Sequence, residues 1–237
     1  MSNGNQLSAS QRSDAMTNLK TVTLDLPITT SVLRDLEIGT IVYLNGRVFT
    51  AREGVYKRAI DDAVGMPATQ AELGSANFHC SPAAVLNADG SHTLGAVSAT
   101  ASFRFAKWFD AWFRLSGCNV IIGKGGLTSA DYRRFFVPHH ALYLTTVGYG
   151  TGALLGRGIK KVVDVHWADQ LGMAQAVWVF DVERFGPFIV ESDLDGNSLF
   201  ERENAKIAGN IEKLYQGTRS ATLRRYGETD DKTSEVI

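Results

Sequence analysis

Hydrophobic and polar residues change their spacing along the chain in a way that predicts both strands and helices. The segment 40–51, TIVYLNGRVFTA, alternates around Asn45-Gly46. An Asn-Gly pair between β-branched segments predicts a two-residue β-hairpin. The next segment, EGVYKRAIDDAVG, carries hydrophobic residues at helical spacing and ends at Gly65, so a helix is expected there.

The stretch 98–117, SATASFRFAKWFDAWFRLSG, predicts an amphipathic helix that ends at Gly117. Small and hydrophobic residues recur every three or four positions along it. In this helix Thr100 would lie in the first turn, and Arg104 would follow one turn later on the same face.

Short hydrophobic runs after this helix predict further strands, which alternate with helix candidates. Because this alternation begins only after the predicted hairpin, we expect a mixed α/β fold with helices flanking a mixed sheet, rather than a purely parallel sheet. The expected strands are Val120–Ile122, Leu142–Val147, Lys161–His166, Ala176–Asp181 and Phe188–Glu191, with one more within ANFHCSPAAVL, and a helix capped by Thr128 or Ser129 is expected between them.

The two ends of the chain differ in composition from its middle. Residues 1–18 are rich in Ser, Asn and Gln, and the segment 217–237 has few hydrophobic residues and mixed charge, so both are expected to be disordered. Overall, 44% of the residues are hydrophobic and 21% are charged, as in a globular protein with a core. We therefore expect one folded domain over residues 19–216.

Charge and cysteine content exclude several classes of function. The formal net charge of −1 gives no electrostatic case for binding nucleic acid or an anionic membrane. Cys80 and Cys118 are far apart and form no CxxC pattern, so neither a disulfide framework nor a metal site on this chain is expected. The N-terminus lacks the apolar run of a signal peptide, and a cytoplasmic location is expected.

The glycine-rich segment NVIIGKGGLTS, residues 119–129, is a candidate anion site. A hydrophobic run leads into Gly123-Lys124-Gly125-Gly126, where backbone N–H groups and one lysine could face an anion. The segment matches neither the Walker A pattern nor the dinucleotide-binding fingerprint. A surface turn with a solvated Lys124 is the competing interpretation.

Two more segments add cations and a hydroxyl group. Thr100 and Arg104 would form an anion site at a helix N-terminus, although an ordinary cap with a solvated arginine explains them equally. Arg52 ends a predicted strand just before a helix, a position from which an arginine can bind a carboxylate in a bidentate manner.

Taken together and in this order, these motifs resemble the β subunit of class I fumarate hydratases and L(+)-tartrate dehydratases, which is the C-terminal domain of single-chain class I fumarases. The segments that carry the resemblance extend over roughly residues 33–200: GTIVYLNGRVFTAREGVYKR, SATASFR, IIGKGG and LGMAQAVWVFDVERFGPFIVESDLDGNSLF. The family pattern implies a swivelling β/β/α domain that pairs with an α subunit in a hetero-oligomer such as α2β2. It also implies reversible addition or removal of water on a small dicarboxylate.

The resemblance further implies roles for individual residues. Thr100 matches the threonine proposed to move the carbon-bound proton, and Arg52, Arg104 and Lys124 match the substrate-binding cations, Lys124 also serving in catalysis. A [4Fe–4S] cluster is implied on the α subunit, with no metal ligand on this chain. The chain departs from the family pattern at Tyr56, where a histidine is usual, and at Phe103 and Phe105, which replace a glycine and a methionine.

Two other functions remain open on the sequence. A domain of the same fold without its partner would be a non-catalytic anion-binding or scaffold protein. A phosphate- or nucleotide-binding protein is the third possibility, and it rests on the glycine loop alone.

Overall fold

The computed structural model of the protein describes residues 19–148 and 150–217. The chain divides into two compact units, Met1–Glu201 and Arg202–Ile237, and helix α9 (Leu199–Tyr215) begins in the first unit and continues into the second. The disorder expected for residues 1–18, and for the tail beyond Gly217, concerns residues outside those described.

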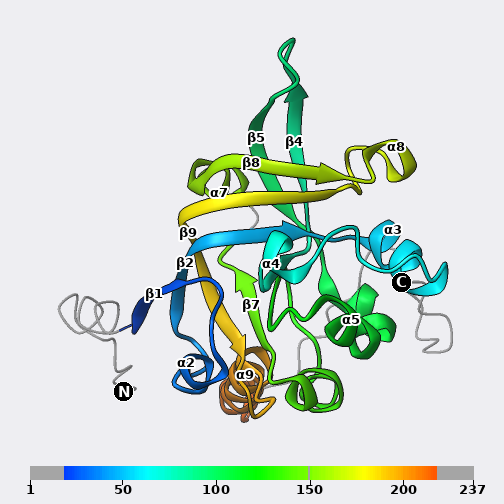
Figure 1. Ribbon diagram of the computed structural model, residues 1–237. Helices are drawn as coiled ribbons and strands as arrows, with labels where there is room; N and C mark the ends of the chain where they lie inside the picture. Colours follow the sequence, from blue (N-terminus) through cyan, green and yellow to red (C-terminus); the bar gives the residue numbers. More distant parts are fainter. Residues whose placement is uncertain (1–18, 149, 218–237) are drawn as a thin grey trace, which may run out of the picture. The chain divides into compact units, whose positions relative to one another are not determined.

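The first unit is built on a seven-stranded sheet with the order β1-β2-β3-β6-β7-β9-β8 and a separate two-stranded sheet, β4-β5 (Figure 1). The strands are β1 (Thr21–Asp25), β2 (Ile41–Thr50), β3 (Ala76–Phe78), β4 (Cys80–Leu86), β5 (His92–Ala99), β6 (Val120–Gly123), β7 (Leu142–Thr146), β8 (Ile159–His166) and β9 (Val177–Ser192). The helices of this unit are α2 (Thr30–Arg34), α3 (Glu53–Tyr56), η1 (Lys57–Asp61), α4 (Gln70–Leu73), η2 (Ser102–Trp108), α5 (Phe109–Ser116), α6 (Ser129–Asp131), η3 (Tyr132–Phe136), η4 (Val137–His139), α7 (Gly152–Gly158) and α8 (Ala168–Leu171).

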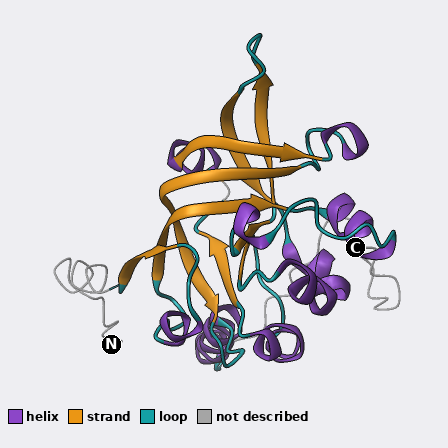
Figure 2. Ribbon diagram, viewed as in Figure 1, coloured by secondary structure: helices purple, strands orange, loops and turns teal. Residues whose placement is uncertain are grey.

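The centre of the large sheet is parallel and its later strands are antiparallel, so the expected mixed α/β fold is confirmed (Figure 2). β2, β3, β6 and β7 run parallel to one another, and the long strand β9 is antiparallel to both β7 and β2. These five strands therefore form a closed ring of hydrogen-bonded neighbours. β9 is one continuous strand in the region where two separate strands, Ala176–Asp181 and Phe188–Glu191, were predicted.

Side chains alternate between two hydrophobic clusters on opposite faces of the strands. On β6, Val120 and Ile122 belong to the first cluster, whereas Ile121 belongs to the second. On β7, Leu142 and Leu144 likewise lie in the first cluster, and Tyr143 lies in the second. The second cluster is rich in aromatic rings from α3, η2, α5 and η3, so these helices cover that face of the sheet.

The predicted hairpin at Asn45-Gly46 is wrong. Both residues lie inside β2, which continues without a turn from Ile41 to Thr50. β2 pairs with β1, β3 and β9, and these long-range pairings outweigh the local turn preference of Asn-Gly. Gly46 marks an irregularity in the pairing with β9, which is where a glycine inside a strand is often found.

The predicted helix from Ser98 to Gly117 is correct only in its later part. β5 continues to Ala99, η2 begins at Ser102, and α5 ends before Gly117, which adopts a left-handed conformation with φ of 66°. Thr100 thus lies in the connection between a strand and a helix, and its placement in a first helical turn is wrong. The small residues Ala99 and Ala101 fitted the helical period without being helical.

The other predicted elements are confirmed with small changes at their ends. The helix before Gly65 is present as α3 and η1, and Thr128 caps α6 by accepting a hydrogen bond from the backbone N–H of Asp131. The strand expected within ANFHCSPAAVL is split at His79 into β3 and β4.

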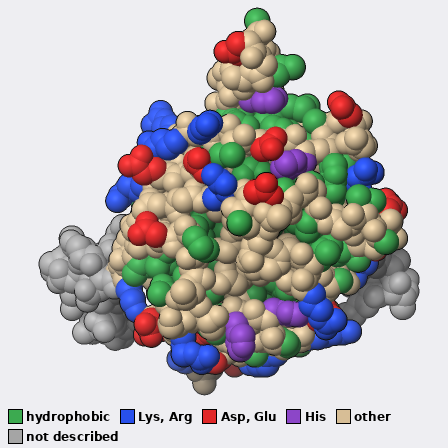
Figure 3. Space-filling model, viewed as in Figure 1, with side chains coloured by type: hydrophobic (Ala, Val, Ile, Leu, Met, Phe, Trp, Pro, Cys, Tyr) green, Lys and Arg blue, Asp and Glu red, His purple; other side chains and the backbone are tan. Residues whose placement is uncertain are grey.

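The surface carries no region of one charge sign on the face shown in Figure 3, where basic and acidic side chains are interspersed. Among the described residues, no helix is both long and apolar enough to cross a membrane. The β4-β5 hairpin extends away from the large sheet of its unit (Figure 1).

Replacing Gly46 with alanine tests the close packing of Leu26 against Gly46, which accompanies the continuous strand β2 in place of the predicted hairpin. Gly46 has φ of 104°, and an added Cβ would lie 2.9 Å from the carbonyl oxygen of Leu26. We expect Gly46→Ala to lower the free energy of unfolding by at least about 2 kcal/mol, since backbone strain and steric overlap add. Denaturant titration of the purified chain measures this value.

Gly90→Ala is the matched control, because Gly90 also has a positive φ, 82°, but an added Cβ would meet nothing within 4 Å. It should cost about 1 kcal/mol from strain alone. Equal losses for the two variants would contradict the packing of Leu26 against Gly46.

Candidate active site

The predicted site residues gather where the central parallel strands end. Arg52 follows β2 and Lys124 follows β6, while Thr100 lies between β5 and η2. Since β2, β3, β6 and β7 are parallel, their carboxyl ends share one edge of the sheet. Loops at this edge of an α/β sheet are the usual place for a ligand site.

Thr100 is joined to two of these strand ends through its backbone. Its N–H donates to the carbonyl oxygen of His79, the residue after β3, at 2.6 Å, and its own carbonyl oxygen accepts from the N–H of Lys124 at 3.2 Å. Ala101 and Lys124 form an isolated parallel bridge. The structure therefore brings Thr100 and Lys124, two residues that the family resemblance assigned to one site, together by backbone pairing.

Arg52 lies at the adjacent strand end and keeps part of its hydrogen-bonding capacity unused. Its Nη1 donates to the carbonyl oxygen of Ala174 at 3.1 Å, and its Nε is buried without a hydrogen-bond partner among the described residues. The charge of Arg52 acts on the nearby Cys80 thiol, favouring the thiolate, although burial still leaves the pKa of Cys80 raised. Cys80 pairs with Ala99, the neighbour of Thr100, so both Arg52 and Thr100 have neighbours at the start of β4.

Arg104 does not share a helical face with Thr100, because Thr100 precedes η2 and Arg104 lies within it. Its side chain is exposed, and its guanidinium carbon is 5.5 Å from the centroid of the Phe105 ring. Within the described residues, no hydrogen bond joins Arg104 to Thr100. Arg104 therefore follows Thr100 closely in the sequence, but its side chain is exposed to solvent.

A cavity of about 210 Å³ opens beside Lys124. It is smaller than the roughly 300–1,000 Å³ of pockets for drug-sized ligands, and so suits a small molecule. Its walls carry a cation, hydroxyl groups and hydrophobic side chains: Lys124, Ser98, Thr146, Thr151, Val97 and Leu155. Sequence reasoning missed Thr146, although its position at the end of a predicted strand was a usable signal.

The glycine loop packs against Glu191 of β9, and the Glu191 side chain is fully buried. The Ser198 hydroxyl donates to Glu191 Oε1 at 2.6 Å, and a Cβ added to Gly126 would lie 2.9 Å from the Glu191 carboxyl carbon. Burial raises the pKa of Glu191. Gly126 is therefore needed for close packing on this carboxyl group, and need not contact a ligand itself.

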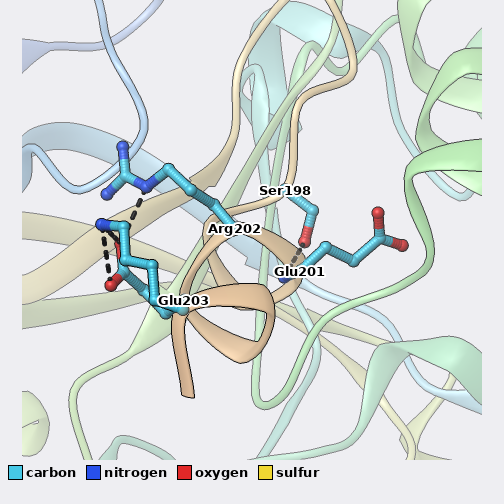
Figure 4. A network of polar contacts seen from close by, with 5 residues as sticks. Ser198, Glu201, Arg202 and Glu203 are labelled. Carbon is cyan, nitrogen blue, oxygen red and sulfur yellow. Dashed lines mark hydrogen bonds and ion pairs between the residues drawn. The ribbon is translucent and has the colours of Figure 1, made fainter. Parts of the chain in front are cut away.

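The start of α6 is also held by a carboxylate. The backbone N–H of Ser129 donates to Glu201 Oε1 at 2.8 Å, and its hydroxyl donates to Oε2. The N–H of Glu201 in turn donates to the Ser198 hydroxyl at 3.2 Å (Figure 4). The segment after Lys124 thus has fixed attachments within the first unit.

In the second unit, Figure 4 shows a separate set of surface ion pairs. Glu203 accepts hydrogen bonds from Arg202 and Lys206, both at 2.8 Å. Such exposed pairs contribute little to stability.

His79 is a further residue of the site that the sequence analysis did not single out. It is fully buried, and burial lowers the pKa of its imidazole to about 3. Tyr56 Oη lies 2.7 Å from its Nε2, and Ser102 Oγ lies 2.7 Å from its Nδ1. A histidine directly after a short hydrophobic strand was the available signal, but it was read as part of a longer strand.

The cysteines of this chain do not fit the ligand set of an iron–sulfur cluster. Cys80 and Cys118 are free and buried, and burial raises the pKa of Cys118 to about 12 and that of Cys80 further. Cluster ligation requires thiolates, which such burial disfavours. No group of three or more His, Cys, Asp or Glu side chains within the described residues is arranged to hold a metal ion.

Comparison with known proteins identifies the family to which this geometry corresponds. The family model described as Fumarase C-terminus matches residues 2–203. The "Putative L(+)-tartrate dehydratase subunit beta" of Methanocaldococcus jannaschii is 31% identical over 188 residues, which cover 79% of this chain and 95% of that relative.

Two more relatives agree with this match. The "L(+)-tartrate dehydratase subunit beta" of Escherichia coli (strain K12) is 30% identical over 187 residues, covering 78% of this chain and 88% of the relative. The "Putative fumarate hydratase class I" of Geobacillus stearothermophilus is 27% identical over 182 residues, covering 77% of this chain but 34% of that longer protein.

The buried His79 makes stability depend on pH in a predictable direction. In the unfolded chain a histidine titrates near its ordinary pKa of about 6.5, whereas in the folded chain the pKa is about 3. Between these values only the unfolded state binds the proton. The stabilising contribution is therefore present above about pH 6.5 and is lost as the pH falls, by about 1.4 kcal/mol per pH unit.

Denaturant titrations at pH 7.5, 6 and 5 should show this slope in the wild type and a shallower one in His79→Asn. The control is His140→Asn, because His140 is exposed and the variant should keep the wild-type slope. If His79→Asn kept the full slope, the neutral state of His79 would be wrong.

Proposed function

The chain belongs to the Fumarase C-terminus family, and from this premise we propose that it is the β subunit of an iron–sulfur-dependent hydro-lyase. The reaction is the reversible removal of water from a small dicarboxylate of the malate or tartrate type. The observation that carries the proposal is the meeting of Thr100 and Lys124 at the carboxyl edge of the parallel strands.

The proposed task of the cations is to bind and neutralise the dicarboxylate. Lys124 lines the small cavity, and Arg52 has a buried Nε without a described partner. Arg104, which is exposed, would turn toward the substrate when the site is complete. Positive charge around a substrate carboxylate also stabilises the negative charge that develops when a neighbouring carbon loses its proton.

The proposed task of Thr100 is to accept the carbon-bound proton during dehydration and to return it during hydration. A neutral threonine hydroxyl is a very weak base, so the proton acceptor in this proposal is the Thr100 alkoxide, a form that surrounding positive charge would favour. Thr100 is 9% exposed, so its side chain is largely shielded from water, which strengthens these electrostatic effects.

The proposal requires a second chain. The cysteines here do not suit a cluster, so we assign the [4Fe–4S] cluster to an α subunit that closes the site, in a hetero-oligomer such as α2β2. When bound, such a cluster supplies a Lewis-acidic iron for the substrate's carboxylate and hydroxyl groups. The two free, buried cysteines of this chain agree with a reducing compartment, and we place the complex in the cytoplasm.

Co-expression of this chain with a candidate α subunit from the same genome, without oxygen, tests the proposal. We expect a brown complex that dehydrates malate or a tartrate, whereas this chain alone should be colourless and inactive. A complex without hydro-lyase activity on fumarate, malate, mesaconate or either tartrate would favour the non-catalytic anion-binding alternative.

Replacing Thr100 tests its role within that complex. Thr100→Ala should lower kcat by about 100-fold or more, since general-base groups contribute about 10²–10⁴-fold, and Thr100→Ser should keep a measurable part because it retains the hydroxyl. Steady-state kinetics at saturating substrate measures both. Thr23→Ala, on the exposed side of β1, is the control and should match the wild type. Full activity of Thr100→Ala would remove Thr100 from the mechanism.

A further inference from the structure

A row of buried polar side chains, joined by hydrogen bonds, lies next to Thr100 and Lys124. Its members come from α3, β3, η2, β7 and the residue that joins β3 to β4. All are fully buried, and none is among the proposed substrate-binding or catalytic residues: Tyr56, Asn77, His79, Ser102 and Tyr143. Burying five polar side chains in an aromatic cluster is costly unless each is hydrogen-bonded.

The spacing of these side chains satisfies that condition. Tyr56 Oη donates to Asn77 Oδ1 at 3.2 Å and lies 2.7 Å from His79 Nε2. On the other side of the imidazole, Ser102 Oγ lies 2.7 Å from Nδ1, and Tyr143 Oη donates to Ser102 Oγ at 2.8 Å. The row is thus unbroken from Asn77 to Tyr143.

One assignment of the hydroxyl protons satisfies every contact along the row and defines a single tautomer of His79. Since Tyr143 gives its proton to Ser102, the Ser102 hydroxyl is free to donate to Nδ1. Since Tyr56 gives its proton to Asn77, the Tyr56 oxygen accepts from Nε2–H. In this assignment four contacts are satisfied by four protons, and we infer that His79 is the Nε2–H tautomer. Burial supports the neutral form, because it lowers the pKa of His79 to about 3.

The row is attached to the reacting groups through the backbone. The His79 carbonyl oxygen accepts the Thr100 N–H at 2.6 Å, and Ser102 follows Thr100 by two residues. Tyr143 Oη lies 3.4 Å from the Lys124 carbonyl oxygen. A shift of the imidazole would therefore move the strand end that holds Thr100 and the start of the lysine loop together.

Gly123 packs directly against two hydroxyl groups of the same row. A Cβ added to it would lie 2.0 Å from Ser102 Oγ and 2.6 Å from Tyr143 Oη. The two hydroxyl groups therefore occupy the space that a side chain would need. The first glycine of the lysine loop thus serves the buried row, and the loop follows the position of these hydroxyl groups.

We propose that His79, held as one tautomer between Tyr56 and Ser102, is a positioning residue that fixes Thr100 and Lys124 for the reaction. The inference rests on the proposed hydro-lyase function. It adds that the row Tyr56–His79–Ser102–Tyr143 acts on turnover through the geometry of Thr100, without touching the substrate.

Single hydroxyl deletions in the αβ complex test the role in turnover. Ser102→Ala and Tyr143→Phe each break the row while changing little volume. We expect kcat to fall by about 10- to 100-fold with KM changed by less than about 3-fold, as expected when a reacting group is slightly misplaced.

The matched control is Ser116→Ala. Ser116 is also buried, its hydroxyl donates to the Trp112 carbonyl oxygen at 2.8 Å, and none of its hydrogen bonds joins a member of the row. This variant should lose comparable stability and keep the wild-type kcat. Equal kcat values for Ser102→Ala and Ser116→Ala, at a temperature where both are folded, would overturn the inference.

Nitrogen NMR of the histidine-labelled full chain tests the tautomer independently of activity. The chain has five histidines, so the His79→Gln variant identifies the signal of His79. We expect a protonated Nε2 and an unprotonated Nδ1 from pH 8 to pH 5, and exchange between both tautomers in Ser102→Ala. A wild-type signal from an imidazolium or from the Nδ1–H form would overturn the inference.

The two proposals fail in different ways. An inactive wild-type αβ complex would contradict the hydro-lyase proposal, while the NMR spectra would still decide whether the row holds His79 as inferred. An active complex with unchanged turnover in Ser102→Ala and Tyr143→Phe would contradict the positioning role and leave the hydro-lyase proposal intact.

Discussion

The pairing of Thr100 with two neighbouring strand ends is the constraint on which the site depends. Its N–H is bound by the carbonyl oxygen of His79, beyond β3, and its carbonyl oxygen is bound by the N–H of Lys124, beyond β6. β3 and β6 are themselves adjacent and parallel. The backbones of Thr100 and Lys124 are thus placed by the register of the sheet, which is fixed by long-range pairing.

Tyr56 and Phe105, two positions at which the family resemblance indicated a departure, contact each other. The rings of Tyr56 and Phe105 are stacked with centroids 5.2 Å apart, and the Phe105 ring also meets His79 edge-on at 4.8 Å. A tyrosine on α3 and the imidazole directly after β3 therefore belong to one packed group. By contrast, Phe103 is 62% exposed, so that departure lies at the surface.

Local patterns predicted the parts of the structure that local forces determine. The helix before Gly65, the cap at Thr128 and the lysine loop at a strand end followed from spacing and turn chemistry. The hairpin prediction failed because β9 and Leu26 pack along β2 at Gly46, contacts that no local pattern contains. The meeting of Thr100 with Lys124 was anticipated through the family resemblance, whereas the buried row under them depends on residues distant in sequence.

The most direct test of the central claim is a crystal structure of the αβ complex with an unreactive dicarboxylate. The account predicts a carboxylate within about 3.2 Å of Lys124 Nζ, a hydrogen-bond distance, with Thr100 Oγ1 facing the adjacent carbon and the α subunit covering this edge. A dicarboxylate bound elsewhere, or an α subunit that leaves the carboxyl edge of β3 and β6 open to solvent, would contradict it.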